Sequence, residues 1–175
     1  NVFIPKVSLN NGVQMPILGF GTNTLRGDVG VRCVSDAISV GYRLIDTAHI
    51  YGNEKAVGEG IETSGIDRKE LFITSKLWVD DAGYEGTKKA FETSLNKLGS
   101  DYLDLYLIHQ PFGDVYGSWR AMEELYRAGQ IKAIGVSNFQ IHHLEDILRN
   151  SQIVPAVNQI EFHPLLVQPD LLQFC

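Results

Sequence analysis

Apolar residues along the chain follow two alternating spacings. Short runs of Leu, Ile, Val and Phe have the length and composition of buried β-strands. Each run is followed by a longer segment in which apolar residues recur three or four positions apart, as on one face of a helix. The runs predict strands at 17–21, 44–46, 71–75, 103–108, 131–136 and 156–160.

The segments between these strands carry residues that commonly begin or end helices. Asp28 is expected to cap the first helix, because a short carboxylate can accept hydrogen bonds from the free backbone N–H groups of a first turn. Glycine and asparagine favour the left-handed conformation that closes many helices. The first five helices are expected to end at or near Gly41, Gly65, Gly99, Gly129 and Asn150, and a sixth is expected to begin at Pro169.

The alternation of strand and helix repeats at about 30 residues, the length of one βα unit, and predicts a parallel sheet covered by helices. Two folds compete. A doubly wound sheet usually carries G-x-G-x-x-G after its first strand, but here 19–22 is followed by Asn23 and Thr24. A (β/α)8 barrel places its chemistry at the C-terminal ends of several strands, and five strands here lead into polar candidates. We therefore predict an α/β protein with the TIM-barrel fold.

The chain is short for a closed barrel. Eight βα units take roughly 250 residues, whereas this chain has 175 residues and the pattern of about six units. Segments 6–9 and 12–15, on either side of Asn10 and Asn11, have the pattern of an N-terminal β-hairpin. We expect residues 1–175 to form a single barrel domain whose C-terminal part, the last two βα units, is missing.

Composition narrows the classes of partner. Lys and Arg number 15 against 21 Asp and Glu, a net charge of −6, which argues against a nucleic-acid-binding protein. The sequence has no apolar run of about 18 residues, the minimum for a membrane span, so no membrane partner is expected. The N-terminal residues lack the apolar core of a signal peptide, and Cys33 and Cys175 do not make a disulfide framework. A cytoplasmic location is predicted.

Three reactive side chains stand at the ends of consecutive predicted strands. Asp46, Lys76 and His109 end the second, third and fourth strands. Neighbouring strands lie about 4.8 Å apart, so in a barrel these side chains should converge on one rim. The carboxylate would keep the ammonium charged, and the ammonium would favour loss of the proton from a nearby phenol. Tyr51, on the loop after Asp46, is the candidate phenol.

This group is suited to delivering a proton to a carbonyl oxygen, with His109 orienting the substrate. A carbonyl that receives a proton also needs a source of electrons, and a nicotinamide hydride would supply it. Glu161 and His163 have the spacing of two metal ligands on one strand face, but no third ligand is evident, and no metal is predicted.

The sequence resembles the aldo-keto reductase superfamily over nearly its whole length, and is most similar to the small bacterial branch near the 2,5-diketo-D-gluconate reductases. Any one of the matching motifs would be weak, but together and in the family's order they are specific. They are 19–22 (GFGT), 41–48 (GYRLIDTA), 51–54 (YGNE), 74–78 (TSKLW), 107–111 (LIHQP), 135–139 (GVSNF) and 158–164 (NQIEFHP).

The resemblance implies roles for individual residues. Tyr51 matches the family's general acid, Lys76 and Asp46 match the pair that tunes it, and His109 matches the residue that orients the carbonyl. Asp46 also matches a contact to the nicotinamide ribose. The residues implied to hold the cofactor's nicotinamide end are Gly21, Thr22, Ser137, Asn138 and Gln159, and those implied to line the substrate pocket are Trp78, His109, Gln110 and Asn23. The implied cofactor is NADPH, with NADH as the alternative, and the implied partner is a small-molecule carbonyl compound bound by a monomer.

The sequence departs from the family's pattern at several points. Asn23 and Gln110 stand where larger members often carry tryptophan, which favours sugar-like or keto-acid substrates. The family's last two strands, its specificity loop, the aromatic that stacks on the nicotinamide and the basic site for the adenosine 2′-phosphate have no counterpart in the 175 residues.

Simpler interpretations compete with these roles. Ser137 and Asn138 could cap a helix that begins near Phe139, and Trp78 could serve packing alone. At the level of the whole protein, the alternatives are a regulatory subunit that binds the cofactor with little turnover and an unrelated barrel enzyme.

Overall fold

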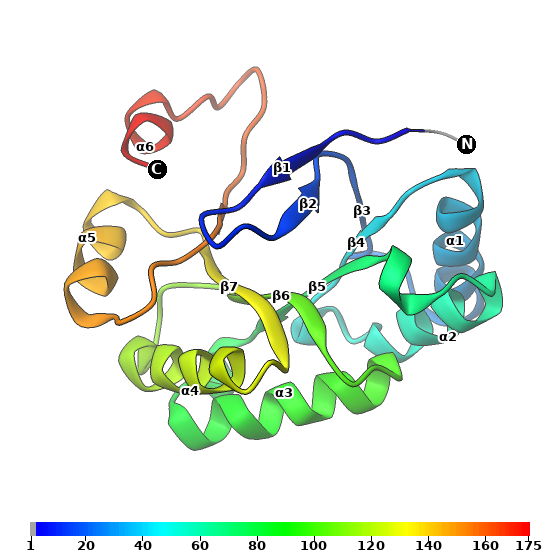
Figure 1. Cartoon of the computed structure of the whole chain (residues 1–175), viewed down its shortest axis with the longest axis horizontal. Coiled ribbons are helices and arrows are strands. Elements are labelled where there is room, and N and C mark those ends of the chain that lie inside the picture. Colours follow the sequence, from blue (N-terminus) through cyan, green and yellow to red (C-terminus); the bar gives the residue numbers. More distant parts are fainter. Residues whose placement is uncertain (1–2) are drawn as a thin grey trace.

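The computed structural model describes residues 3–175, and its centre is a sheet of six parallel strands that curls into a half barrel (Figure 1). Each strand hydrogen-bonds to the next one in the sequence, so that within the described residues the first and last strands form the two edges. The strands are β3 (Gly19–Gly21), β4 (Leu44–Asp46), β5 (Phe72–Leu77), β6 (Leu103–Ile108), β7 (Ile131–Ser137) and β8 (Asn158–Gln159). The predicted α/β fold with parallel strands is therefore confirmed.

Helices cover the outer, convex face of this sheet (Figure 1). They are α1 (Gly27–Val40), α2 (Glu54–Ser64), α3 (Tyr84–Leu98), α4 (Val115–Arg127) and α5 (Ile141–Asn150), with α6 (Pro169–Phe174) after β8. Single 3₁₀ turns lie at η1 (His49–Tyr51), η2 (Arg68–Glu70) and η3 (Val79–Asp81). The main core fills the space between helices and strands, and Trp119, Tyr106, Phe91 and Ile73 are among its fully buried side chains.

The predicted N-terminal hairpin is also confirmed, and it covers the inner face of the sheet at one end. It consists of β1 (Lys6–Ser8) and β2 (Gln14–Pro16), which pair antiparallel. Apolar hairpin residues pack on a second, smaller cluster formed by residues of β4, β5, β6 and β7. That cluster contains Leu44, Phe72, Leu105, Leu107 and Ala133, and the hairpin contributes Leu9, Val13 and Met15. The chain therefore leaves the C-terminal ends of its strands open for chemistry.

Several predicted boundaries differ from the structure. Lys76 lies within β5 rather than after it, and β8 is confined to two residues. Ile17 and Leu18 precede β3 and are exposed, and the backbone N–H of Ile17 donates to the carbonyl of Pro5, which holds this segment beside the hairpin. The apolar run at 17–21 is thus divided: Ile17 hydrogen-bonds to the segment before the hairpin strand β1, and Gly19–Gly21 pair with β4.

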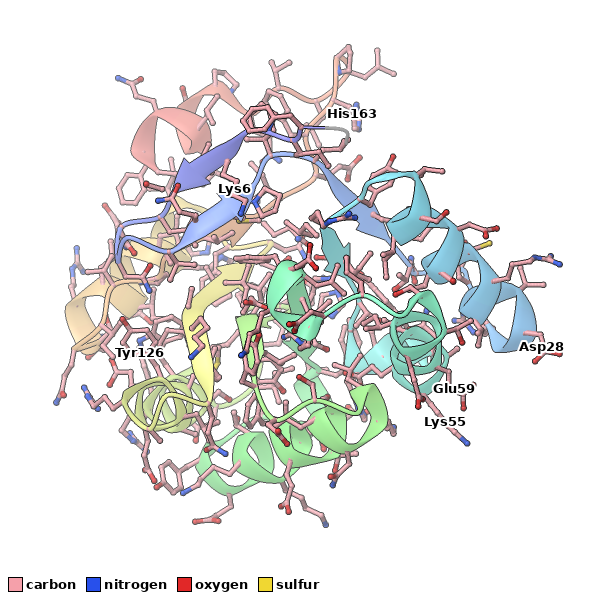
Figure 2. All side chains as sticks on the ribbon, turned by 45° about the vertical axis from the view of Figure 1, so that its right-hand side comes forward. Lys6, Asp28, Lys55, Glu59, Tyr126 and His163 are labelled. Carbon is pink, nitrogen blue, oxygen red and sulfur yellow. The ribbon has the colours of Figure 1, made fainter. Side chains whose placement is uncertain are left out.

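The helix ends agree with the prediction at or near Gly41, Gly65, Gly99, Gly129 and Asn150, and the predicted start at Asp28 differs. Gly41, Gly65 and Gly99 have positive φ angles of 117°, 69° and 62° and close their helices as expected. Asp28 does not cap α1, because Arg26 occupies the cap position and Asp28 lies in the first turn. Its carboxylate points away from the sheet in Figure 2, where it can still interact with the positive end of the helix dipole.

The described residues include no helix with the length and apolar character needed to cross a lipid bilayer.

Helices α2 and α3 approach closely at Gly58, and we expect Gly58→Ala to destabilise the protein by about 1–3 kcal/mol. A Cβ at this position would lie 2.8 Å from the carbonyl carbon and oxygen of Leu98 and from the carbonyl oxygen of Lys97. Urea unfolding would measure the change. Glu59→Ala is the matched control, since Glu59 and Lys55 form only an exposed pair on the outer face of α2 (Figure 2). Equal effects of the two substitutions would contradict the close packing.

Candidate functional site

The open rim is organised around Lys76, a fully buried lysine with three acceptors. Its Nζ lies 2.5 Å from Oδ1 of Asp46, 3.0 Å from the carbonyl oxygen of Thr47 and 3.3 Å from the hydroxyl of Tyr51. An ammonium has three N–H donors, so each can have a partner. A buried charge is tolerated when it is paired and fully hydrogen-bonded, and Asp46 supplies the opposite charge.

Strand register explains why these groups meet. Asp46 pairs with Thr74 on the neighbouring strand, and Lys76 lies two residues beyond Thr74. Side chains two apart on a strand point to the same face, so Lys76 reaches back over the end of β4. The backbone N–H of His109 donates to the carbonyl of Leu77, which extends the β5–β6 ladder to the rim. Asp46, Lys76 and His109 thus lie together at one rim of the half barrel, as the strand order predicts.

Tyr51 enters this group from η1, the single 3₁₀ turn beyond β4. Gly52 ends the turn with a φ of 66°, a left-handed angle that glycine adopts without steric cost. The ring of Tyr51 meets the ring of His109 edge to face, with 5.8 Å between centroids, and His109 meets Trp78 in the same way at 5.2 Å. A phenol, an imidazole and an indole therefore line one side of the rim.

His109 is held as a neutral imidazole. Burial, and to a lesser degree the positive charge of Lys76, lower its pKa from the usual 6.5 to about 4, although the carboxylate of Asp46 acts in the opposite direction. Its Nδ1 is buried and has no hydrogen-bond partner among residues 3–175. Since an unpaired buried donor is costly, the proton is better placed on Nε2.

We expect NMR titration to show that His109 stays unprotonated from pH 8 down to about pH 5, whereas an unperturbed histidine titrates near 6.5. In Lys76→Met, the midpoint of His109 should move to higher pH, because a cause of the lowering is lost and Asp46 keeps its raising effect. The ring Cε1–H shift would report both. A wild-type midpoint near 6.5 would contradict this account.

A second set of polar residues lies at the ends of β7 and β8. The Nε2 of Gln159 donates to Oδ2 of Asp46 across the mouth of the half barrel, at 2.9 Å. Both oxygens of Asp46 therefore have a partner. Ser137 donates through Oγ to the carbonyl of Gln159 at 2.8 Å. Asn138 adopts a φ of 61°, rare for a residue other than glycine, and its Nδ2 donates to the carbonyl of His109 at 3.0 Å.

The groups in this set that remain free to form hydrogen bonds are acceptor oxygens. Within residues 3–175, no group donates to Oδ1 of Asn138 or to Oε1 of Gln159. The single hydroxyl proton of Ser137 is already donated to β8. Asn138 and Gln159 thus fit an external amide that brings N–H donors, such as a nicotinamide carboxamide, whereas Ser137 joins the two strands.

The capping alternative for Ser137 and Asn138 is wrong. Helix α5 begins at Ile141, and Gln140 is its N-cap. The backbone N–H of Gln140 donates to Nδ1 of His143, and its own side chain accepts in return, which forms a capping box. The earlier pair is therefore not needed to begin the helix.

The loop after β3 contributes backbone rather than reactive groups. Gly21 pairs with Asp46 and has open space where a side chain would begin. Thr22 is fully buried, and both its N–H and its hydroxyl donate to the carbonyl of Asp46. Asn23 is exposed and Gln110 is half-buried. Neither of these two side chains hydrogen-bonds to another residue in the described part of the chain.

Sequence reasoning missed two parts of this site. One is the carbonyl of Thr47, which receives Lys76; a backbone group carries no residue-type signal. The other is Asn53, which is 3% exposed and makes three hydrogen bonds. Its presence in the motif 51–54 was the available signal, since a buried amide must find partners.

Comparisons with known proteins agree with this geometry. The family model described as "Aldo/keto reductase family" matches residues 17–175. The chain is 58% identical to "Uncharacterized oxidoreductase YtbE" of Bacillus subtilis, over 97% of this chain and 63% of that protein. It is 56% identical to "Glyoxal reductase" of the same organism, over 97% of this chain and 62% of that protein. The chain thus spans less than two thirds of these relatives' length.

Solved structures show the same architecture. The crystal structure of an aldo-keto reductase from Bombyx mori in complex with NADP superposes with a TM-score of 0.93 at 37% identity. The match covers all of this chain and 64% of that one.

Proposed function

The chain belongs to the aldo/keto reductase family, and on that premise we propose that it reduces aldehyde or ketone carbonyls to alcohols with NADPH, using Tyr51 as the proton donor. The observation that carries the proposal is the buried ammonium of Lys76, which touches both the Asp46 carboxylate and the Tyr51 hydroxyl. An ammonium in this position can stabilise the negative charge that forms on the phenol oxygen when its proton is transferred.

Two groups would act on the carbonyl oxygen. Tyr51 transfers its proton to that oxygen, and Lys76, 3.3 Å from the phenol oxygen, stabilises the charge left behind. His109, neutral and protonated on Nε2, donates a hydrogen bond to the same oxygen and orients it. An uncharged imidazole does not compete with Tyr51 as an acid, so the two roles stay separate.

Asn138 and Gln159 would hold the cofactor through their free oxygens, which suit the N–H groups of a carboxamide. When bound, the nicotinamide supplies the hydride for the carbonyl carbon. The roles proposed for Gly21, Thr22 and Asp46 are to form the wall beside the nicotinamide and its ribose. We propose NADPH over NADH because the Bombyx mori relative was solved with NADP.

Trp78, Asn23 and Gln110 would border the substrate. Trp78 meets His109 edge to face, while Asn23 and Gln110 offer free amide groups. The pocket would therefore have an aromatic side chain on one side and amide side chains that can hydrogen-bond to the substrate. This combination suits small dicarbonyls, keto acids and sugar-like aldehydes, and a relative that is 56% identical is named glyoxal reductase.

We also propose that the protein works as a monomer in the cytoplasm, with residues 1–175 in a single barrel domain. One continuous sheet runs from β3 to β8, and one chain supplies Asp46, Tyr51, Lys76 and His109. No group at the rim needs a second copy.

The test is NADPH oxidation by the polypeptide that carries this sequence, purified at its natural length. Glyoxal-type dicarbonyls and aromatic aldehydes are the first substrates, and loss of NADPH absorbance is the measurement. Turnover with either class is the expected result. Tight NADPH binding without turnover on any carbonyl would favour a regulatory subunit. The absence of both NADPH binding and turnover would overturn the proposal.

A further inference from the structure

Asn53, two residues after the proposed acid, is more deeply buried than Tyr51 itself. Its Oδ1 accepts from the hydroxyl of Thr47 at 2.9 Å. Its Nδ2 donates to the carbonyl of Thr22 at 2.6 Å and to the carbonyl of Leu25 at 2.8 Å. Both amide protons and the oxygen therefore have protein partners, so this buried side chain has no N–H donor left for a ligand.

The donor end of Asn53 holds the loop after β3. Thr22 and Leu25 lie on either side of Asn23, a proposed substrate contact, so the amide fixes both ends of that loop segment. Thr22 is itself bonded to the carbonyl of Asp46 through its N–H and hydroxyl. One side chain thus joins the Tyr51 segment to the pocket wall and to the end of β4.

The acceptor oxygen of Asn53 holds Thr47, the residue whose backbone carbonyl accepts a hydrogen bond from Lys76. Thr47 gives its hydroxyl to Asn53, and the carbonyl of the same residue accepts from Nζ of Lys76 at 3.0 Å. The orientation of Thr47 therefore links Asn53 to the ammonium, and through the ammonium to the Tyr51 hydroxyl.

The turn that carries Tyr51 depends on such anchors. It is a single 3₁₀ turn, and short turns of this kind have little stability of their own. On the other side, Glu54 is buried and accepts from the hydroxyls of Ser75 and Ser94 at 2.7 and 3.1 Å. Asn53 fixes the turn toward the mouth of the half barrel, and Glu54 fixes it toward α3.

We infer that Asn53 is a positioning residue for the reaction, and that its amide sets the position of Tyr51 relative to Lys76 and the Asn23 loop. This inference rests on the proposed function for its effect on turnover. Its structural part, the placement of Tyr51 beside His109, can be measured without turnover or cofactor.

The central variant is Asn53→Asp, which keeps the shape and the acceptor for Thr47 but replaces the two donors by an oxygen. That oxygen would face two carbonyl oxygens and repel them. Thr47→Val is a second, milder variant, which removes only the hydroxyl and keeps the carbonyl that binds Lys76. The matched control is Glu123→Ala on α4, which removes the buried acceptor of the backbone N–H groups of Gln152 and Ile153, at 2.7 and 2.8 Å.

We expect the nuclear Overhauser effect between the Tyr51 and His109 rings, present in the ligand-free wild type, to be lost in Asn53→Asp and weakened in Thr47→Val. A displacement of about 1 Å can cost on the order of 100-fold in rate, so kcat should fall roughly 10- to 100-fold in Asn53→Asp. The Kd for NADP+ should change by less than about threefold. Glu123→Ala should keep the ring contact and kcat despite a lower Tm.

Retention of the ring contact and of kcat in both Asn53→Asp and Thr47→Val would overturn the inference. So would an equal loss of both in Glu123→Ala, which would indicate general destabilisation. If Asn53→Asp does not fold, the ring contact and kcat of Thr47→Val decide whether the inference holds. If the wild type shows the ring contact but no turnover, the proposed function fails, and Asn53 is then judged on the ring contact alone.

Discussion

Tyr51→Phe is expected to lower kcat by about 10³-fold, within the range of 10²–10⁴ that a positioned general acid contributes. The substitution removes one oxygen and keeps the ring that packs against His109. Lys76 keeps Asp46 and the Thr47 carbonyl as partners, so the rest of the rim should hold its geometry. Steady-state kinetics and a separate NADPH-binding titration are the measurements, and the Kd for NADPH should be nearly unchanged.

The matched control for this change is Tyr84→Phe. Tyr84 also donates its hydroxyl to a side chain, the carboxylate of Glu124, but on the outer surface of α3. Its kcat should equal that of the wild type. If Tyr51→Phe retained more than a tenth of the wild-type kcat, another group would have to be the proton donor.

Lys76→Met is expected to abolish turnover and also to destabilise the fold. The methionine has a similar length but carries no charge, so Tyr51 loses the cation that stabilises its phenolate. Removing one partner of a buried ion pair typically costs about 3–5 kcal/mol. The Asp46 side chain is 18% exposed and keeps Gln159 as a donor, so a loss of about 2–3 kcal/mol is expected in urea unfolding.

Two further variants separate the effects of charge and stability. Lys88→Met removes a surface lysine 2.8 Å from Glu124, and exposed pairs contribute less than about 1 kcal/mol. In the double variant Asp46→Asn with Lys76→Met, part of the stability should return because no unpaired carboxylate remains, while kcat stays low. A double variant no more stable than Lys76→Met would show that the pair's charges do not control stability.

Much of the fold could be read from the sequence, because strands and helices here carry distinct hydrophobic periods and glycines mark helix ends. The convergence of Asp46, Lys76 and His109 followed from strand order alone, since consecutive parallel strands end on the same rim. Tyr51 was placed by its position on the loop after Asp46, and the resemblance of the motif 51–54 supported that placement.

Features that depend on long-range pairing could not be predicted. The bond between Gln159 and Asp46 joins residues 113 positions apart across the mouth, and no local pattern encodes it. Asp28 was assigned as a cap because the residue type fits, but the N-cap is Arg26 and α1 begins at Gly27, which has a φ of 53°, so the helix starts two residues earlier than predicted. The extent of the barrel domain beyond this sheet stays a prediction.

The hairpin has a consequence for the order in which the chain assembles. Asn10 donates to the carbonyl of Pro155, and Asn11 donates to the carbonyl of Lys132, contacts that join residues 145 and 121 positions apart. Closing such long loops is entropically unfavourable until the partner segments are in place. The hairpin, although it precedes the six-stranded sheet in the sequence, is therefore expected to dock only after β7 has formed.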